Sequence, residues 1–256
     1  MAFAPPGWLV PVWGAPAGVR SAVTTRQGPG MSAGPYERFN LGARSGDDPA
    51  AVRANRAALG DALGLGVMPH WLQQVHGNDV YVAHGGTDSV EPIADAAVTR
   101  TRGEPLVILT ADCLPVLLCD DAGSVVGAAH AGWRGLAAGV IERTVATMAA
   151  KPSSLRAWLG PCIGAASYEV GEEVRAAFVD GDADAANCFA SSRPGHWHAN
   201  LAALARRRLS MMGVTRVGGG GFDTFTDARF YSYRRDGARS GRFASVIWLD
   251  DAPASS

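Results

Sequence analysis

Three short segments place side chains that can bind a metal ion at the ends of apolar runs. They are QQVHGND with His76, LTADCLPV with Cys113 and AAHAGWRG with His130. Two imidazoles and a thiolate suit Zn²⁺, whose catalytic sites keep three protein ligands and leave a fourth position for water or substrate. The wide spacing matches no zinc-finger motif. The residue types therefore indicate an open zinc site, provided that the fold brings the three side chains together.

The same residues permit chemistry without a metal. Cys113 could act as a nucleophile with His130 or His76 as its general base, as in thiol hydrolases. The spacing does not decide which histidine lies near the sulfur, so both hypotheses stay open.

A His₂Cys set also occurs in blue-copper sites. A multicopper oxidase needs several further histidines, however, and a chain with six histidines has only four beyond this pair.

The other histidine and cysteine motifs indicate less chemistry. His196 and His198 flank a tryptophan in HWHAN, and we expect surface or capping roles for them. The segment PCIG lacks the second cysteine of the P-C-x-x-C motif, and no histidine precedes a glutamate by two residues, which excludes the usual cytidine deaminase architecture. Cys119 lies inside the apolar run VLLCD and is expected to be a small core residue.

Arginines supply the candidate anion sites. Arg134 stands two residues before LAAGV, so its guanidinium and the free amides of a helix start could together hold a phosphate. Further arginines in polar turns matter only if they converge on the three candidate metal ligands. These are Arg26 in TTRQGPG and Arg234, Arg235, Arg239 and Arg242 in SYRRDGARSGR.

Composition indicates an ordinary globular protein. The chain has 256 residues, of which 47% are hydrophobic, enough for a sizeable core. A net charge of -1 argues against general electrostatic binding to nucleic acid or acidic membranes. The first residues lack the basic region of a signal peptide, and no run reaches the length of a transmembrane helix. We therefore expect a cytoplasmic protein with reduced cysteines.

The elements that must position these residues follow from apolar patterns. Asp48 is the expected N-cap of a helix that begins at Pro49 and ends near Gly64. The runs WLQQV, VYVA, PLVIL, PVLLCD and SVVGAAH have the length and composition of strands. Because these runs are almost unbroken, the strands are expected to be covered on both faces.

The C-terminal half alternates strands and helices. The segments GLAAGVIERTVATMAA, YEVGEEVRAAF and NLAALARRRLSMMG are predicted helices, the last with Asn200 as its N-cap, and LRAWLG, GVTRVGGGG and FASVIWL are predicted strands. No repeat or linker divides the chain. The prediction is therefore one mixed α/β domain over residues 1–256, with helices packed outside a sheet core.

Several segments, read in order, resemble the YfiH/YlmD family of laccase-domain proteins. They include TTRQGPGMSAGPYERFNLGARSGDDPAAVRANR, LQQVHGNDV, ADAAVTR, TADCLPVLL, AAHAGWRGLAAGVI, LGPCIGAASYEVGEEV and YSYRRDGARSGRFASVIWL. The resemblance implies a single YfiH-like α/β domain in which mixed sheets lie between outer helices in four layers. It also implies a zinc site on His76, Cys113 and His130, with copper as the alternative metal.

The family resemblance implies particular reactions as well. Members once labelled polyphenol oxidases are now regarded as purine nucleoside phosphorylases that act on adenosine, inosine and 5'-methylthioadenosine and deaminate adenosine, and some are described as peptidoglycan editing factors. The implied partners are purine nucleosides and phosphate, with no obligate protein partner. Arg134 is the candidate phosphate ligand, with Arg26 and Asn40 as further candidates. If Cys113 is instead a nucleophile, an amidase acting on a cell-wall precursor is the alternative.

Two departures from the family pattern are visible. Many members carry a Cys-Thr pair before the SYRRD segment, whereas this chain has Asp223 where that thiol would fall. The first loop, commonly GGVS, is lengthened here to GPGMS around Pro29. Because Asp223 replaces the cysteine of the Cys-Thr pair, no role of that cysteine can be carried over to this chain.

Overall fold

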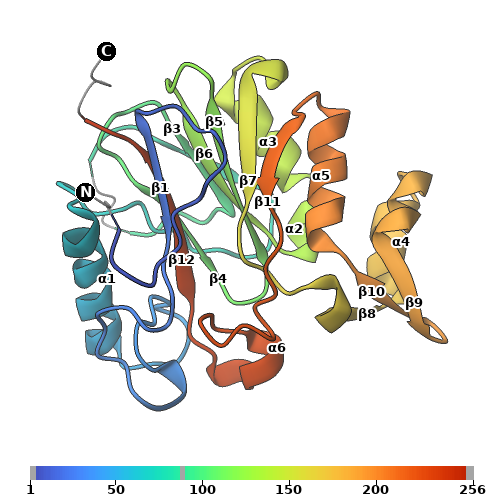
Figure 1. The fold of residues 1–256 in the computed structure, drawn as a ribbon, viewed down its shortest axis with the longest axis horizontal. Coiled ribbons are helices and arrows are strands. Elements are labelled where there is room, and N and C mark those ends of the chain that lie inside the picture. Colours follow the sequence, from blue (N-terminus) through green and yellow to red (C-terminus); the bar gives the residue numbers. More distant parts are fainter. Residues whose placement is uncertain (1–3, 87–89, 252–256) are drawn as a thin grey trace.

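The computed structural model describes residues 4–86 and 90–251, in which two sheets pack face to face between helices (Figure 1). The larger sheet has six strands in the order β11-β7-β5-β6-β3-β2. Their bounds are β11 Arg216–Gly219, β7 Leu155–Leu159, β5 Leu114–Asp120, β6 Val126–Ala131, β3 Ala96–Thr99 and β2 Val80–Ala83. The β11–β7 and β2–β3 pairs are parallel and the other pairs are antiparallel. The sheet is therefore mixed, as predicted.

The smaller sheet is antiparallel and has the order β1-β12-β4. Its strands are β1 Val19–Val23, β12 Phe243–Leu249 and β4 Leu106–Thr110. In β12, Phe243 and Ile247 point into the core between the two sheets, whereas Val246 and Trp248 pack with Leu59 of helix α1. The apolar run FASVIWL is thus a strand of period two with both faces covered.

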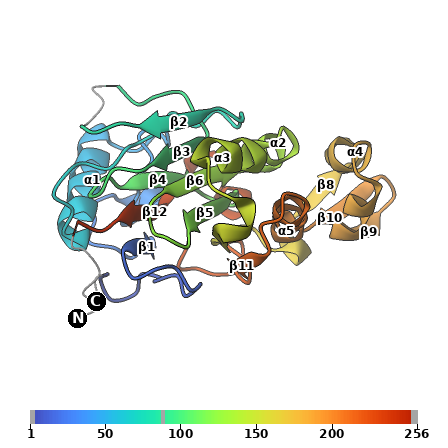
Figure 2. The same cartoon turned by 90° about the horizontal axis from the view of Figure 1, so that it is seen from above.

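Helices cover the outer faces of both sheets and complete the predicted arrangement of sheets between helices. Helix α1 (Pro49–Leu63) lies against the smaller sheet, and α3 (Val140–Met148) and α5 (Leu201–Met211) lie against the larger one (Figures 1 and 2). Asp48 caps α1 by accepting a hydrogen bond from the backbone N–H of Ala50, and Asn200 caps α5, as the sequence predicts. No helix in the described part of the chain is both long and apolar enough to cross a membrane.

Two predicted helices are shorter than their sequence pattern. The segment GLAAGVIERTVATMAA forms α2 (Trp133–Ala137) and then α3, because Gly139 takes a left-handed φ of 87° and breaks the helix between them. The segment YEVGEEVRAAF begins as strand β8 (Glu169–Gly171), and helix α4 starts only at Glu172 and runs to Val179. The period of the apolar residues did not mark either boundary.

One further prediction is corrected. WLQQV is no regular strand, since the isolated bridge at Gln73 is its only strand-like pairing in the described structure and the next bridge, at His70, precedes it. HWHAN, for which surface or capping roles are expected, forms strand β10 (His196–Ala199) directly before α5, at the centre of a third sheet with β8 and β9 (Phe189–Arg193) that projects beside α4 (Figure 2). The short helix α6 is Tyr233–Asp236. The 3₁₀ turns of the described residues are Gly34–Tyr36, Pro152–Ser154, Ala165–Ser167, Ala183–Cys188 and Gly237–Arg239.

Candidate metal centre

Strand pairing brings two of the three predicted ligands together. In the antiparallel β5–β6 pair, Leu114 lies opposite Ala131 and Pro115 opposite His130. Cys113 immediately precedes β5, so its side chain falls on the same face of the sheet as that of His130, because side chains alternate along strands. This face points toward the smaller sheet, at the edge where the two sheets separate.

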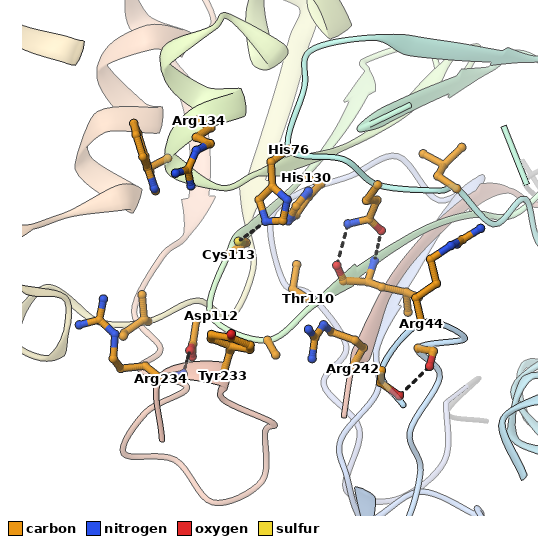
Figure 3. Close-up of a pocket in the computed structure, with 18 of the residues that line it drawn as sticks. Arg44, His76, Thr110, Asp112, Cys113, His130, Arg134, Tyr233, Arg234 and Arg242 are labelled. Carbon is orange, nitrogen blue, oxygen red and sulfur yellow. Dashed lines mark hydrogen bonds between the residues drawn. The ribbon is translucent and has the colours of Figure 1, made fainter. Parts of the chain in front are cut away.

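The third ligand comes from the loop before β2. The nearest ligand atoms of His76, Cys113 and His130 all lie within 4.8 Å of one another (Figure 3). The Sγ atom of Cys113 is 3.8 Å from Nε2 of His76, and the two histidine rings meet edge to face with their centroids 4.8 Å apart. The fold therefore gathers the three predicted residues into one cluster.

Gly132 provides the space in which the cluster fits. A Cβ atom at this position would lie 2.8 Å from the Cys113 Sγ and 3.2 Å from Cδ2 of His76. Real Cβ atoms essentially never come within 2.8 Å of another atom, so any other residue would displace the Cys113 sulfur and crowd the His76 ring. Glycine in the AHAGWRG turn is therefore required by the side chains opposite it.

A buried carboxylate that the sequence did not single out orients two of the ligands. Asp95 accepts a hydrogen bond from Nδ1 of His130 at 2.8 Å. It also accepts bonds from the backbone N–H groups of Val75, His76 and Gly77 at 3.1, 2.9 and 2.6 Å. With Nδ1 occupied, His130 is left with Nε2 for a metal ion, which is the usual arrangement of metal-binding histidines.

Asp95 also holds the unusual backbone of the His76 loop. His76 has a left-handed φ of 63°, uncommon for a residue other than glycine, and the three N–H bonds to Asp95 fix it. Burial alone would raise the pKa of Asp95, but the hydrogen bond and charge of His130 and the backbone N–H groups hold it below its ordinary value. The carboxylate is therefore ionised and can accept all these bonds.

Gln74 anchors the same loop from its other side. Its side-chain amide donates to the backbone carbonyl of Leu109 at 2.8 Å and accepts from the backbone N–H of Leu109 at 2.9 Å. The side chain thus pairs with β4 as a neighbouring strand would. The loop that carries His76 is fixed to both sheets.

The electrostatics of the cluster favour the thiolate of Cys113. Burial alone would raise its pKa, but the charge of His130 and hydrogen bonds from His130 and His76 lower the pKa of Cys113 to about 6. Burial would lower the pKa of His130, yet the charge of Cys113 and the bond with Asp95 raise it to about 9. The thiolate is the form that binds metals and attacks electrophiles, so the donor set fits Zn²⁺.

The cluster opens into a cavity of about 600 Å³. Its size lies within the range of small-molecule sites. Five arginines line it, Arg44, Arg56, Arg134, Arg234 and Arg242, together with the aromatic side chains of Trp133, Tyr168 and Tyr233 (Figure 3). A cavity with this lining suits a ligand that has an aromatic ring and an anionic group.

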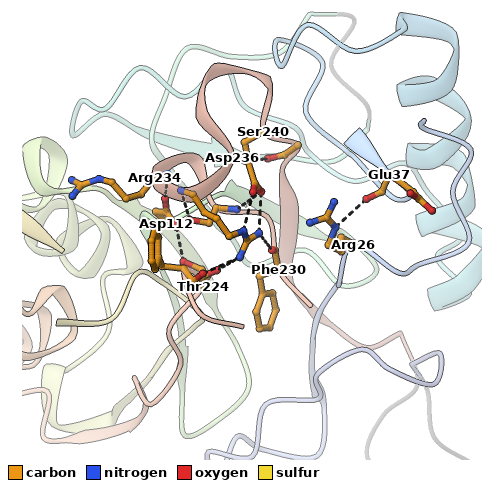
Figure 4. Close-up of polar contacts among 12 residues, drawn as sticks. Arg26, Glu37, Asp112, Thr224, Phe230, Arg234, Asp236 and Ser240 are labelled. Atoms are coloured by element: carbon orange, nitrogen blue, oxygen red, sulfur yellow. Dashed lines mark hydrogen bonds and ion pairs between the residues drawn. The ribbon is translucent and has the colours of Figure 1, made fainter. Parts of the chain in front are cut away.

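The three candidate phosphate ligands lie in different places. Arg134, on α2, lines the cavity and stacks on the ring of Trp133 at 4.4 Å. Arg26 is not among the cavity-lining residues, and its guanidinium donates to the backbone carbonyl of Glu37 (Figure 4). Asn40 is fully buried and lies behind the cavity wall, where it accepts from the backbone N–H of Arg242.

Of the arginines in SYRRDGARSGR, some line the cavity and others do not. Arg235 is structural, since its guanidinium donates to the backbone carbonyls of Thr224 and Phe230 and to Asp236 (Figure 4). Arg234 and Arg242 line the cavity, and Arg239 does not. Part of the SYRRDGARSGR segment therefore does converge on the cluster.

Comparison with known proteins places the chain in a family. Residues 20–250 match the family described as multi-copper polyphenol oxidoreductase laccase. The chain belongs to this laccase-domain family. It is 52% identical to a purine nucleoside phosphorylase of Xylella fastidiosa (strain Temecula1), covering 95% of this chain and 98% of the relative. It is 47% identical to the purine nucleoside phosphorylase YfiH of Escherichia coli (strain K12), covering 94% and 98%.

Solved structures of the family have the same fold. Neisseria meningitidis protein NMB0706 superimposes with a TM-score of 0.89 at 46% identity, covering 95% of this chain and 99% of the neighbour. YlmD from Geobacillus stearothermophilus superimposes with a TM-score of 0.85 at 30% identity, covering 96% and 97%. The predicted fold and family are therefore confirmed.

In this laccase-domain protein the described residues contain one group of three or more side chains able to hold a metal, namely the His–Cys–His cluster. The other four histidines lie elsewhere. His70 is buried near Glu104, His84 follows β2, and His196 and His198 are on β10. The donor set at the cavity therefore fits a single ion rather than a multinuclear copper cluster.

The family cysteine that this laccase-domain protein lacks is replaced by a carboxylate with a structural position. Asp223 accepts hydrogen bonds from the backbone N–H of Gly164 at 2.9 Å and from the hydroxyl of Ser167 at 2.7 Å. These bonds fix the turn that leads to Tyr168 in the cavity wall. Asp223 therefore supports the wall from outside the cavity.

Proposed function

We propose that this laccase-domain protein is a zinc-dependent purine nucleoside phosphorylase that also deaminates adenosine. The observation that carries the proposal is the convergence of His76, Cys113 and His130 at the floor of a cavity lined by arginines and aromatic rings. The names of its relatives support the phosphorylase reaction. The substrates are then purine nucleosides and inorganic phosphate.

His76, Cys113 and His130 would hold the zinc ion. Bound Zn²⁺ supplies a Lewis acid that polarises an oxygen or nitrogen atom of the substrate or of water. The chain contributes the ligand geometry, because Asp95 keeps the proton on Nδ1 of His130 and fixes the backbone of the His76 loop. A preorganised ligand set of this kind loses little free energy on closing around an ion.

Phosphorolysis requires phosphate beside the anomeric carbon of the ribose. A new C–O bond forms there, the glycosidic C–N bond breaks, and its electron pair leaves with the purine. Among the described residues the guanidinium of Arg134 makes no hydrogen bond and only stacks on Trp133, so its donors can hold phosphate beside the sugar. The rings of Trp133, Tyr168 and Tyr233 are available to stack on the purine.

Deamination uses the same placement of the base. Water adds to purine C6 and ammonia leaves, so adenosine becomes inosine. The reaction needs no phosphate, and omission of phosphate therefore separates the two activities.

The test is incubation of the zinc-loaded protein with adenosine, with and without phosphate. We expect adenine and ribose 1-phosphate only when phosphate is present, and inosine in both mixtures. Cys113→Ala should lose zinc and both activities together. Absence of turnover by the zinc-loaded wild type would refute the proposal, and full activity of the variant would refute the ligand assignment.

The second candidate is a cysteine hydrolase or amidase with Cys113 as nucleophile. The lowered pKa of Cys113 and the Asp95–His130 hydrogen bond favour it, because a thiolate beside an oriented imidazole is the arrangement that such enzymes need. Removal of the metal distinguishes the candidates, since a cysteine hydrolase keeps or gains activity when chelated. Copper at the same ligands, which the family description suggests, is tested by metal analysis of the purified protein.

A further inference from the structure

We propose that Arg242 forms a second oxyanion subsite in the cavity, separate from the one at Arg134. The ligand chemistry is that of a phosphate group, either inorganic phosphate or the phosphate ester of a nucleotide. The inference deepens the proposed function and rests on it only for the choice of these ligands. Its basis is the hydrogen bonding of the cavity arginines, taken one by one.

Two of the five arginines are committed to the protein. Arg44 and Arg56 both form ion pairs with Glu91, and Arg56 also donates through Nε to the backbone carbonyl of Leu41 at 2.9 Å. Arg44 donates further to the side chain of Gln73. Their charge is partly neutralised, and they have few donors left for a ligand.

Arg242, unlike Arg44 and Arg56, keeps one edge of its guanidinium available for a ligand. Its Nη1 donates to the backbone carbonyls of Ser240 and Gly241 at 2.7 and 2.9 Å. Within residues 4–86 and 90–251, Nε and Nη2 have no hydrogen-bond partner, and no carboxylate forms an ion pair with the guanidinium. The free Nε–Nη2 edge carries the two parallel N–H groups that match the oxygens of a phosphate.

The surroundings fix the backbone and the aliphatic part of Arg242 before any ligand arrives. Oδ1 of Asn40 accepts from the backbone N–H groups of Arg242 and Gly42 at 2.8 and 3.0 Å. A Cβ at position 42 would lie 2.7 Å from Cγ of Arg242, so glycine makes room for the aliphatic part of the side chain. Asn40, a predicted phosphate ligand, is thus placed to act through Arg242.

The subsite is separate from Arg134 and from Arg234, whose Nη1 donates to the backbone carbonyl of Glu169 at 3.1 Å. Figure 3 shows Arg134 and Arg234 on one side of Cys113 and Arg242 on the other. The charges of Arg234 and Arg134 both reach Tyr168, whereas Arg242 lies beside Tyr233, 5.9 Å from its ring centroid. Burial lowers the pKa of Arg242, so a poorly solvated cation gains from a bound anion. Two anionic groups can therefore be held on opposite sides of the metal ligands.

The test is equilibrium dialysis of the zinc-loaded protein against labelled phosphate or adenosine 5'-monophosphate. Loss of a bidentate charged contact should weaken binding by roughly 10- to 100-fold, so Arg242→Gln is compared with Arg242→Lys, which keeps the charge but not the two parallel donors. Arg239→Gln is the matched control, since Arg239 belongs to the same segment but does not line the cavity, and it should change either affinity by less than about twofold.

Each outcome decides the matter. Weaker phosphate binding by Arg242→Gln identifies free phosphate as the ligand, and weaker binding of the nucleotide alone identifies the ester. Unchanged binding of both overturns the subsite. Phenylglyoxal labelling of wild-type Arg242 covers the case in which the variants fold poorly, because protection by either ligand supports the subsite and absence of protection refutes it. Binding is measured without turnover, so an inactive protein would refute the proposed function but not this subsite.

Discussion

Replacing Asp95 with asparagine should weaken metal binding and stability together, although Asp95 is not a ligand. Oδ1 of Asp95 accepts from the backbone of His76 and from Nδ1 of His130, and Oδ2 accepts from Val75 and Gly77. An asparagine has only one acceptor oxygen. In either orientation of the asparagine amide, its NH₂ group faces two N–H donors that a carboxylate oxygen of Asp95 accepts in the wild type.

The magnitude follows from these lost bonds. A buried donor without an acceptor costs about 1–3 kcal/mol, so two of them cost about 2–6 kcal/mol of the free energy of unfolding. Loss of the group that orients a metal-binding histidine lowers metal affinity by about 10- to 100-fold. The two effects have one cause, because His130 and the His76 loop share the same carboxylate.

The assay compares Asp95→Asn with a matched control at the other end of β5. Asp120 is also buried and accepts hydrogen bonds from the backbone N–H groups of Ser124 and Val125 and from the Ser124 hydroxyl. Urea unfolding of the metal-free proteins measures stability, and titration with Zn²⁺ against a chromophoric chelator measures affinity. We expect Asp120→Asn to lose stability alone and Asp95→Asn to lose both.

The pH dependence gives a second measurement. Because the folded-state pKa of Asp95 is lowered, its contribution to stability is present above the ordinary carboxyl pKa of about 4 and disappears as the pH falls further. The stability difference between wild type and Asp95→Asn should therefore shrink as the pH falls below about 4. Equal zinc affinity of the Asp95 and Asp120 variants would refute the assigned role of Asp95.

The remaining predictions concern the ligands. In the chelated protein, iodoacetamide should alkylate Cys113 with a midpoint near pH 6 and Zn²⁺ should protect it, as peptide mapping would reveal; a midpoint near pH 9 would contradict the lowered pKa. Gly132→Ala should lower zinc affinity at least tenfold, whereas Gly60→Ala in α1, whose added Cβ meets nothing within 4 Å, should leave affinity unchanged and raise stability slightly. Chelation should abolish both phosphorolysis and deamination, and restored Zn²⁺ should recover them; activity that persists would favour a thiol mechanism.

The sequence allowed the cluster of His76, Cys113 and His130 to be predicted because these residue types are chemically distinctive. His76, Cys113 and His130 each end an apolar run, and strand ends at a sheet edge are where such side chains meet. Asp95 has no comparable mark. Its function depends on β3 lying beside β6 and on the fold of residues 75–77, neither of which appears in local spacing.

The arginines show the same limit. Arg26 and Arg242 look alike in sequence, since both stand in polar turns. Only the pairing of β1 with β12 and of β12 with β4 decides that Arg242 enters the cavity and Arg26 does not. The helix break at Gly139 was missed for a similar reason, because the apolar stripe continues through it while the backbone turns.

The candidate metal ligands lie on a core that forms without them. Cys113 directly precedes β5 and His130 lies within β6, and both strands are buried throughout, so hydrophobic burial fixes the positions of the two residues. Asp95 and Gln74 then fix the His76 loop by hydrogen bonds within the protein. A zinc finger, by contrast, gains its fold from its metal. In this chain the fold itself supplies the arrangement of the three candidate ligands.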